Sequence, residues 1–343
     1  MARNDVFLRA CRREPVPYTP VWFMRQAGRY QPEYRAIREK YSLLEICRQP
    51  ELAATVTLLP VRQLGVDAAI LFSDIMIPLG GVGVEFEIRE SVGPMVHQPI
   101  RTLAQVEALR PLEPEESLPY VLEAIRILRR ELEVPLIGFA GAPFTLASYL
   151  VEGRPSRNFV HTKAMMYRAP EVWRALMNRL TEMVVTYARA QVQAGAEAIQ
   201  IFDSWVGALA PEDYRTYVLP HMQRLFAGLR DLGVPVIHFG VGTGSLLELM
   251  REAGGDVIGV DWRVPLDQAW ERVGHDRAVQ GNLDPALLLA PPEVLAERTR
   301  GILRQAGGRP GHIFNLGHGV LPETPPDALR RVVEIVHSET AAG

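Results

Sequence analysis

The 343-residue sequence predicts an α/β barrel of eight parallel strands, a (β/α)8 TIM barrel, on three observations. Short apolar runs recur eight times, and each is followed by a small or polar residue and then by a longer amphipathic stretch. The runs are continuously apolar, which is typical of strands buried on both faces. No change of composition marks a linker, so residues 1–343 are predicted to form a single domain.

The predicted strands are separated by stretches long enough for the helices that connect parallel strands. In chain order they are Val21–Met24, Ala68–Phe72, Pro135–Phe139, Ala198–Phe202, Pro235–Phe239, Val257–Val260, Ala278–Gln280 and His312–Asn315.

Helical patterns occupy the stretches between these strands. Pro32 stands at the first position of one predicted helix, and another begins near Pro143. Residues 171–192 predict a long amphipathic helix that ends before Gly195. Residues 80–99 differ, because glycines and alternating apolar residues there predict a β-hairpin inserted after the second strand.

Composition and charge exclude several classes of protein. Hydrophobic residues make up 48% of the chain and charged residues 22%, as in globular proteins that bury a large core. The formal net charge is −3, so there is no global positive field, and we expect no binding to nucleic acid or to a membrane surface. The amino terminus lacks the apolar region of a secretory signal, and no apolar run approaches the ~20 residues of a membrane span. We therefore expect a cytoplasmic protein.

The counts of cysteine and lysine restrict the possible chemistry. Cys11 and Cys47 are too few for a disulfide scaffold or a structural zinc site, and we expect two free thiols. Lysine occurs only at Lys40 and Lys163, neither of which follows an apolar strand, so an imine-forming lysine is not indicated. The other basic residues are arginines, which suit carboxylates and phosphates, although coding bias also produces such a skew.

Reacting groups of such barrels lie at the carboxyl ends of the strands, and here most strand ends carry a polar residue or a glycine. The residues past the successive strands are Arg25 to Arg29, Ser73 and Asp74, Ala140 and Gly141, Asp203 and Ser204, Gly240, Asp261, Gly281 and Asn282, and Asn315 with His318.

The loop after the first strand is the most informative of these by charge. It reads Arg25, Gln26, Ala27, Gly28, Arg29. A positive φ at Gly28 would let successive backbone N–H groups converge on an anion, and the two arginines would add charge. The loop thus favours a carboxylate or phosphate ligand. Ion pairs between the arginines and acidic residues of a neighbouring helix explain the same pattern equally well.

Three further residues are candidates for the site. Asp74 follows an apolar run and would be a carboxyl group with little water around it, unless it only accepts N–H bonds at a helix start. His318 lies between two glycines, where a packing role is disfavoured. Tyr149 falls on the first turns of a predicted helix between two leucines, a position that more often belongs to the core.

One segment suggests a different function. Residues 238–262 read as strand, glycine-rich loop, helix and strand, with Asp261 placed 21 residues after Gly240. This order resembles the nucleotide-binding unit of dehydrogenases and S-adenosylmethionine methyltransferases. Only 82 residues follow Asp261, too few for the doubly wound sheet that such a unit begins, so we expect the glycines to form a barrel loop.

Six segments together resemble the uroporphyrinogen decarboxylase family. They read PVWFMRQAGRYQPEYR, LFSDI, GFAGAPFTLASYLVEG, IQIFDSWVG, HFGVGTG and FNLGHGVLPETPPD, and they span the chain from Pro20 to Asp327. The resemblance implies a (β/α)8 barrel and a homodimer. It also implies decarboxylation of the four acetate side chains of uroporphyrinogen III to coproporphyrinogen III, in haem biosynthesis, without a cofactor or metal.

The resemblance also assigns site residues by position. It places the substrate-binding loop on Arg25, Gln26, Ala27, Gly28 and Arg29 and the pyrrole-binding carboxylate on Asp74. It places an active-site tyrosine on Tyr149, a hydroxyl group on Ser204 and a histidine on His318. Of these residues, Asp74, Arg25 and Tyr149 are the predicted catalytic ones.

Two other functions remain possible on the same barrel. Related methyltransferases, zinc- or corrinoid-linked, hold zinc with a His-x-Cys pair and a later cysteine. Here the corresponding residues are His238, Phe239 and Gly240, and no later cysteine exists, which disfavours this function. A barrel that binds a porphyrinogen without reacting with it is the third possibility.

Overall fold

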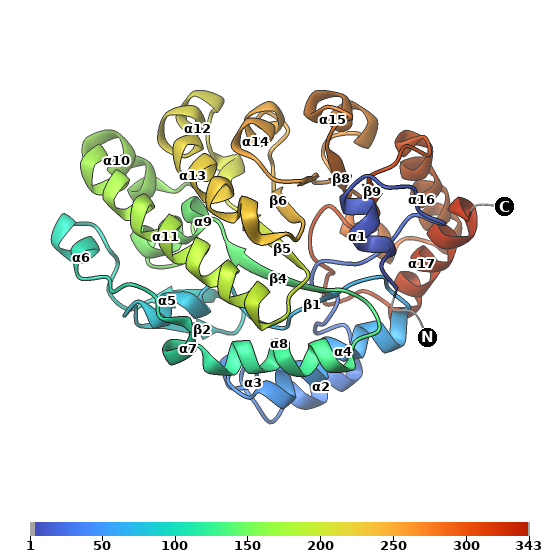
Figure 1. The fold of residues 1–343 in the computed structure, drawn as a ribbon, viewed down its shortest axis with the longest axis horizontal. Coiled ribbons are helices and arrows are strands. Elements are labelled where there is room, and N and C mark those ends of the chain that lie inside the picture. The colour runs from blue at the N-terminus through green and yellow to red at the C-terminus, as the bar shows by residue number, and fades with distance from the viewer. Residues whose placement is uncertain (1–3, 342–343) are drawn as a thin grey trace.

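The computed structural model describes residues 4–341 and centres on one curled parallel sheet with helices on its outer face (Figure 1). Within these residues the sheet has seven strands, each hydrogen-bonded in parallel to the next. In order they are β1 (Ala69–Ile70), β4 (Leu136–Gly141), β5 (Ala198–Asp203), β6 (Val236–Gly240), β7 (Val257–Gly259), β8 (Ala278–Gln280) and β9 (His312–Ile313). The predicted alternation of strands and helices is confirmed.

The predicted strand Val21–Met24 is wrong in its extent. Only Val21 makes a bridge, to Phe314. Side chains take the next amides: the Phe23 N–H donates to Gln26 Oε1 over 3.1 Å, and the Met24 N–H donates to Asn315 Oδ1 over 3.1 Å. A ladder cannot continue where its donors are already used.

The segment nevertheless closes the barrel. The Trp22 N–H donates to the Phe314 carbonyl beyond β9 over 3.3 Å, and the Asp67 N–H donates to the Val21 carbonyl over 2.8 Å just before β1. Both edges of the sheet thus bond to one extended segment. Strand closure of this kind leaves no exposed sheet edge.

Helices follow the strands as the sequence predicts, and many begin with proline at their first positions. The described α-helices are α1 (Val6–Cys11), α2 (Pro32–Arg38), α3 (Leu43–Cys47), α4 (Pro50–Leu64), α5 (Ile77–Gly81), α6 (Leu103–Glu107), α7 (Pro114–Ser117), α8 (Pro119–Glu131), α9 (Pro143–Glu152), α10 (Val160–Arg168), α11 (Pro170–Ala194), α12 (Pro211–Tyr217), α13 (Leu219–Leu229), α14 (Leu247–Ala253), α15 (Leu266–Val273), α16 (Pro292–Ala306) and α17 (Pro326–Thr340). Short 3-10 helices are η1 (Val206–Ala208), η2 (Arg230–Leu232) and η3 (Pro285–Leu289). Among residues 4–341, no helix combines the length and apolarity needed to cross a bilayer.

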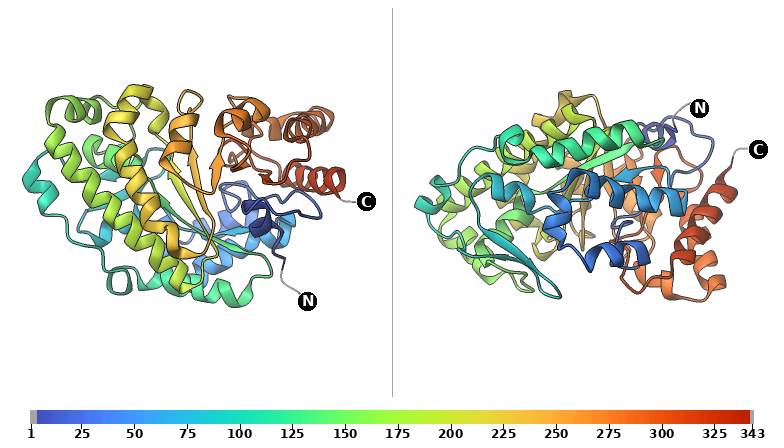
Figure 2. Two further views of the ribbon diagram at one scale, coloured as in Figure 1. Left: turned by 45° about the horizontal axis from the view of Figure 1, so that its top comes forward. Right: turned by 90° about the horizontal axis from the view of Figure 1, so that it is seen from below.

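The predicted hairpin is present as β2 (Phe86–Arg89) and β3 (Gly93–Val96), which pair antiparallel. It projects from the barrel as the blue-green ribbon in the right-hand view of Figure 2. The Val96 N–H donates to the Gly153 carbonyl over 2.8 Å, which ties the hairpin to the end of α9.

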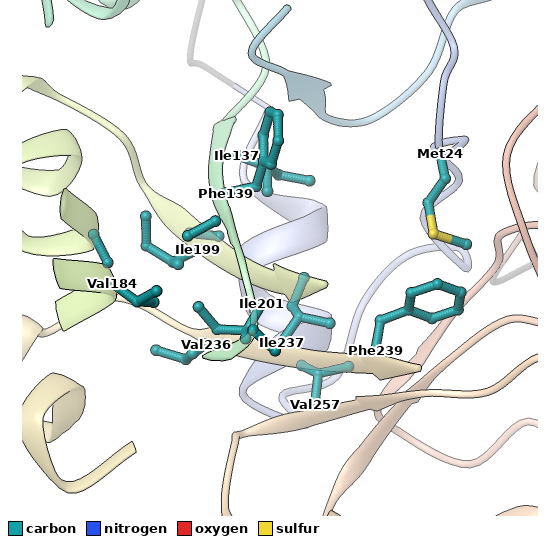
Figure 3. Packing of buried hydrophobic residues seen from close by; sticks show 14 of the residues in the cluster. Met24, Ile137, Phe139, Val184, Ile199, Ile201, Val236, Ile237, Phe239 and Val257 are labelled. Carbon is teal, nitrogen blue, oxygen red and sulfur yellow. The ribbon is translucent and has the colours of Figure 1, made fainter. Parts of the chain in front are cut away.

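The barrel interior combines apolar packing with one chain of polar bonds. Figure 3 shows apolar side chains on both faces of strands β4 to β7, together with Val184 of α11 and Met24. Below the strand ends, the Trp22 indole N–H donates to Gln280 Oε1 over 2.9 Å, and Gln280 Nε2 donates to Gln200 Oε1 over 3.0 Å. Cys11 and Cys47 are buried and free, as predicted.

Candidate active site

The loop from Arg25 to Arg29 is fixed to the barrel by its second residue. The Gln26 side chain is fully buried, and its Nε2 donates to the Ala68 carbonyl over 3.1 Å. The Tyr30 hydroxyl donates to the Gln26 carbonyl over 2.7 Å. Ala27 is half-buried against the small cluster formed with Tyr34. The side chain of Gln26 therefore holds the loop in place.

The predicted positive φ at Gly28 is wrong. The left-handed residue of the loop is Arg25, with φ 58°. The Gly28 N–H donates to Gln31 Oε1 over 3.1 Å, so it is not available to an anion. A Cβ on Gly28 would lie 3.2 Å from the Arg25 carbonyl oxygen. Close approach of the backbone, and not its dihedral angle, accounts for the glycine.

Arg25 and Arg29 are exposed, and neither forms a salt bridge with a carboxylate of the described residues. The interpretation of these arginines as ion-pair partners is therefore wrong. The side chain of Arg25 packs over Gly319, where a Cβ would lie 2.7 Å from Arg25 Cγ. Its charge acts on Asp74, Tyr149 and His318, so these groups surround one region.

Asp74 is half-buried just past β1, and the Met76 N–H donates to its Oδ1 over 2.9 Å. Burial raises the pKa of this carboxyl group above its usual value, and the Met76 N–H and the Arg25 charge oppose the rise. The bond from the Met76 N–H agrees in part with the alternative that Asp74 only accepts N–H bonds at a helix start. This one hydrogen bond does not offset the loss of solvation, so the pKa of Asp74 stays raised. A raised pKa of this kind is typical of carboxyl groups in functional sites.

Tyr149 lies on α9 with its ring 6.0 Å from that of Trp205 in an edge-to-face arrangement. Burial raises the pKa of its hydroxyl group to about 12; the Trp205 side chain lowers it and Asp74 adds to the rise. Ser204 is half-buried directly after β5 and next to Trp205. The carboxyl end of β5 and the helix after β4 thus bring Tyr149 and Ser204 to the same side as Asp74.

His318 lies between two aromatic rings. Its ring stacks on Trp262 at 6.4 Å and 15°, and it is 6.5 Å from the Phe239 ring. Burial lowers its pKa to about 4, and the charges of Arg25 and Arg263 add to the effect. His318 is therefore neutral near pH 7.

Sequence reasoning missed an aromatic lining at the strand ends. The Phe139 and Phe202 rings meet edge-to-face at 5.5 Å, and the Phe202 and Phe239 rings do so at 5.9 Å. Each phenylalanine stands at or near the end of its strand, in LIGF, IQIF and VIHF. The repeated phenylalanine near the ends of three predicted strands is the sequence feature that could have indicated this lining. These largely buried rings form an apolar layer inside the barrel near the strand ends.

The nucleotide-binding interpretation does not fit the structure. β6, the glycine loop, α14 and β7 are consecutive parts of the barrel. Asp261 is buried, accepts the N–H groups of Gly242 and Arg263, and pairs with Arg263 Nη1 at 2.7 Å. Its carboxylate oxygens are therefore bonded within the barrel loop and are not placed to bind a ribose.

The histidine at the position of the methyltransferases' zinc-binding pair, His238, lies outside the candidate site. His238 is fully buried, and its ring is 4.9 Å from that of Phe226 on α13, in the layer between sheet and helices. Burial lowers its pKa to about 4. In the described part of the chain, no three His, Cys, Asp or Glu side chains lie close enough to hold a metal ion.

Comparison with known proteins agrees with this geometry. The family model described as uroporphyrinogen decarboxylase (URO-D) matches residues 2–339. The chain is 60% identical to the uroporphyrinogen decarboxylase of Carboxydothermus hydrogenoformans over 97% of this chain and 96% of that one. It is 61% identical to that of Thermus thermophilus over 98% and 99%.

Among solved structures, a methyltransferase from Methanosarcina mazei matches with a TM-score of 0.81 over 97% of each chain, at 23% identity. A B12-independent methionine synthase from Shewanella sp. matches with a TM-score of 0.57 at 14% identity, over 84% of this chain and 88% of that one. At these identities the matches establish the shared fold alone. The family match over nearly the whole chain, together with relatives about as long as the chain itself, shows that the chain belongs to the uroporphyrinogen decarboxylase family.

Proposed function

We propose that this chain removes carbon dioxide from the four acetate side chains of uroporphyrinogen III and yields coproporphyrinogen III without a cofactor. The observation that carries the proposal is the position of Asp74. It is a desolvated carboxyl group near the unpaired cation of Arg25 and on the same side of the barrel as the phenylalanine rings. The named relatives support the same substrate.

The substrate itself can accept the electrons that decarboxylation releases. Protonation of the pyrrole carbon that bears the acetate makes the ring cationic. The bond to the carboxylate then breaks, carbon dioxide leaves, and its electron pair neutralises the ring as an exocyclic methylene. A second proton adds to the methylene to form the methyl group, and loss of the first proton restores the pyrrole. One proton is consumed for each acetate.

Asp74 would act on the charge of this intermediate. An ionised carboxylate that accepts hydrogen bonds from the pyrrole N–H groups stabilises a cationic ring more than a neutral one. Those bonds also favour its ionised form and so reverse the raised pKa of the free protein. We therefore assign Asp74 the central electrostatic role and Tyr149 a place beside it.

The loop from Arg25 to Arg29 would hold the carboxylate side chains. Charge-assisted pairs with guanidinium groups are strong and directional. We assign the binding contacts to Arg25 and Arg29, with Ser204 and His318 at the rim. Gln26, Ala27 and Gly28 shape the loop that presents the two arginines.

The neutral state of His318 limits the choice of proton donor. At a pKa of about 4 it carries no proton to give near pH 7, and arginine is too weak an acid. A protonated carboxyl group of the substrate and a water molecule are further candidate donors, and the pH dependence of the Asp74 variants tests Asp74 as a general acid. A substrate complex would show which of them lies at the ring carbon.

Activity is expected to survive exhaustive treatment with a chelator. The chemistry above needs no metal, since the pyrrole is the electron acceptor. Uroporphyrinogen turnover by the dialysed protein, with and without added zinc, is the measurement. Loss of turnover on chelation and its return with zinc would contradict the proposal and favour a methyltransferase-like metal enzyme.

We further propose that residues 1–343 work as one domain, in the cytoplasm, as a homodimer whose two barrel mouths face a shared interface. The family resemblance supports the dimer. Sedimentation velocity at assay concentrations is expected to give a dimer. An active monomer under those conditions would contradict the shared interface.

A further inference from the structure

Asp203 is a carboxyl group that the chemistry above does not use, although it directly precedes Ser204. Along β5, Gln200 bonds to Gln280 across the barrel, and Phe202 packs against Phe139 and Phe239. Because side chains alternate along a strand, Asp203 points the other way, toward the helices. It therefore lies behind the site and does not face the substrate.

Hydrogen bonds connect this hidden carboxyl group to the front of the site. The Thr145 hydroxyl donates to Asp203 Oδ1 over 2.9 Å, and the same hydroxyl oxygen accepts the Trp205 N–H over 3.2 Å. Thr145 and Tyr149 are four residues apart on α9, so they share one face of the helix. The Trp205 ring packs against Tyr149. One hydroxyl group thus ties the end of β5 to the helix that carries Tyr149.

Stability does not account for Asp203. The side chain is fully buried, and neither its Oδ2 nor the buried Tyr214 hydroxyl has a hydrogen-bond partner among the described residues. Burial raises the pKa of Asp203 to about 7, and the Thr145 hydroxyl opposes the rise. An unsatisfied buried carboxyl group costs folding free energy that a well-packed apolar residue would not.

We propose that Asp203 and Thr145 are positioning residues: their hydrogen bond orients the Thr145 hydroxyl toward the Trp205 N–H and so fixes Trp205, Ser204 and Tyr149 for turnover. The proposal rests on the proposed function, since it requires that Tyr149 meets the substrate. It identifies a support for the site that the family resemblance did not supply. It assigns no contact with substrate to Asp203 or Thr145.

The test uses Thr145→Val, which keeps the shape of the side chain and removes the hydroxyl group. We expect kcat for uroporphyrinogen to fall about tenfold or more, with a smaller change in KM, because a small misplacement of a positioned group slows turnover. Thr145→Ser keeps the hydroxyl group and should restore most of the rate. Asp203→Asn keeps an acceptor at Oδ1 and should also retain most of it.

A double-mutant cycle separates positioning from a general loss of packing. If Thr145 acts through Tyr149, adding Thr145→Val to Tyr149→Phe should cost little beyond Tyr149→Phe alone. The matched control is Thr299→Val on α16, since that threonine is equally buried and its hydroxyl bonds to Leu295 within its own helix. The control should turn over at the wild-type rate.

Several results would overturn the inference. They are a wild-type rate in Thr145→Val, a wild-type rate in Tyr149→Phe, fully multiplicative losses in the double mutant, and a loss in Asp203→Asn as large as that in Thr145→Val. The wild-type chain in the same assay tests the proposed function by itself. An inactive wild type overturns both proposals, whereas an active wild type with an active Thr145→Val overturns only this one.

Discussion

Asp74→Asn is expected to lower kcat/KM for uroporphyrinogen by roughly two to three orders of magnitude, the range observed when one preorganised electrostatic group is removed from a transition state. The substitution keeps the shape of the side chain but removes its charge. It also turns an N–H donor toward the N–H donors of the substrate. Steady-state turnover of purified protein is the measurement.

Asp74→Glu separates charge from placement. It keeps the carboxylate at a displaced position, so it should retain more activity than Asp74→Asn. It should also accumulate partly decarboxylated products, since each acetate must turn into the same place. Equal activity of the two variants would argue against a role for the charge.

The pH dependence of kcat/KM distinguishes a fixed anion from a general acid. The pKa of Asp74 is raised in the free protein by burial. A required anion therefore makes kcat/KM fall as pH drops through that raised pKa, and Asp74→Asn should lose this acidic limb. A general acid would instead cause loss of rate at high pH. An alkaline limb that disappears in Asp74→Asn would overturn the electrostatic role.

Arg25→Ala and Arg29→Ala are each expected to lower kcat/KM about tenfold to a hundredfold, because a hydrogen bond to a charged group contributes about 1.5–3 kcal/mol. Lysine should rescue poorly, since the planar fork is lost. Arg298→Ala is a suitable control, because Arg298 is an exposed arginine on α16. Near-normal turnover in Arg25→Ala would show that it is only a surface residue.

The strand pattern was predictable because buried parallel strands need continuous apolar runs, and β8 was predicted residue for residue. The short extent of pairing at the first predicted strand, Val21–Met24, was not predictable. Its ladder is interrupted by a bond from the Met24 N–H to Asn315 Oδ1, between residues 291 positions apart. A single sequence carries no signal for such a pairing.

The site was predictable to the extent that position on a strand determines where a side chain lies. Asp74 and Ser204 were predicted in this way, and the family resemblance added weight to Tyr149. The inward-turned Gln26 and the neutral His318 were not predictable, because each depends on neighbours brought close only by folding. The pair of Asp203 and Thr145 escaped notice for the same reason.

The way in which the barrel closes between β9 and β1 has a consequence for the entry of a bulky ligand. β5 and β6 pair over five residues, whereas the segment at residues 20–22 is joined to its neighbours by three backbone bonds. A junction with so few bonds is expected to open locally at a lower free energy than the long ladder between β5 and β6. The loop from Arg25 to Arg29 continues directly from that junction. We therefore expect a macrocycle to enter and leave by a displacement of this loop and its anchor, while β5 and β6 keep their register.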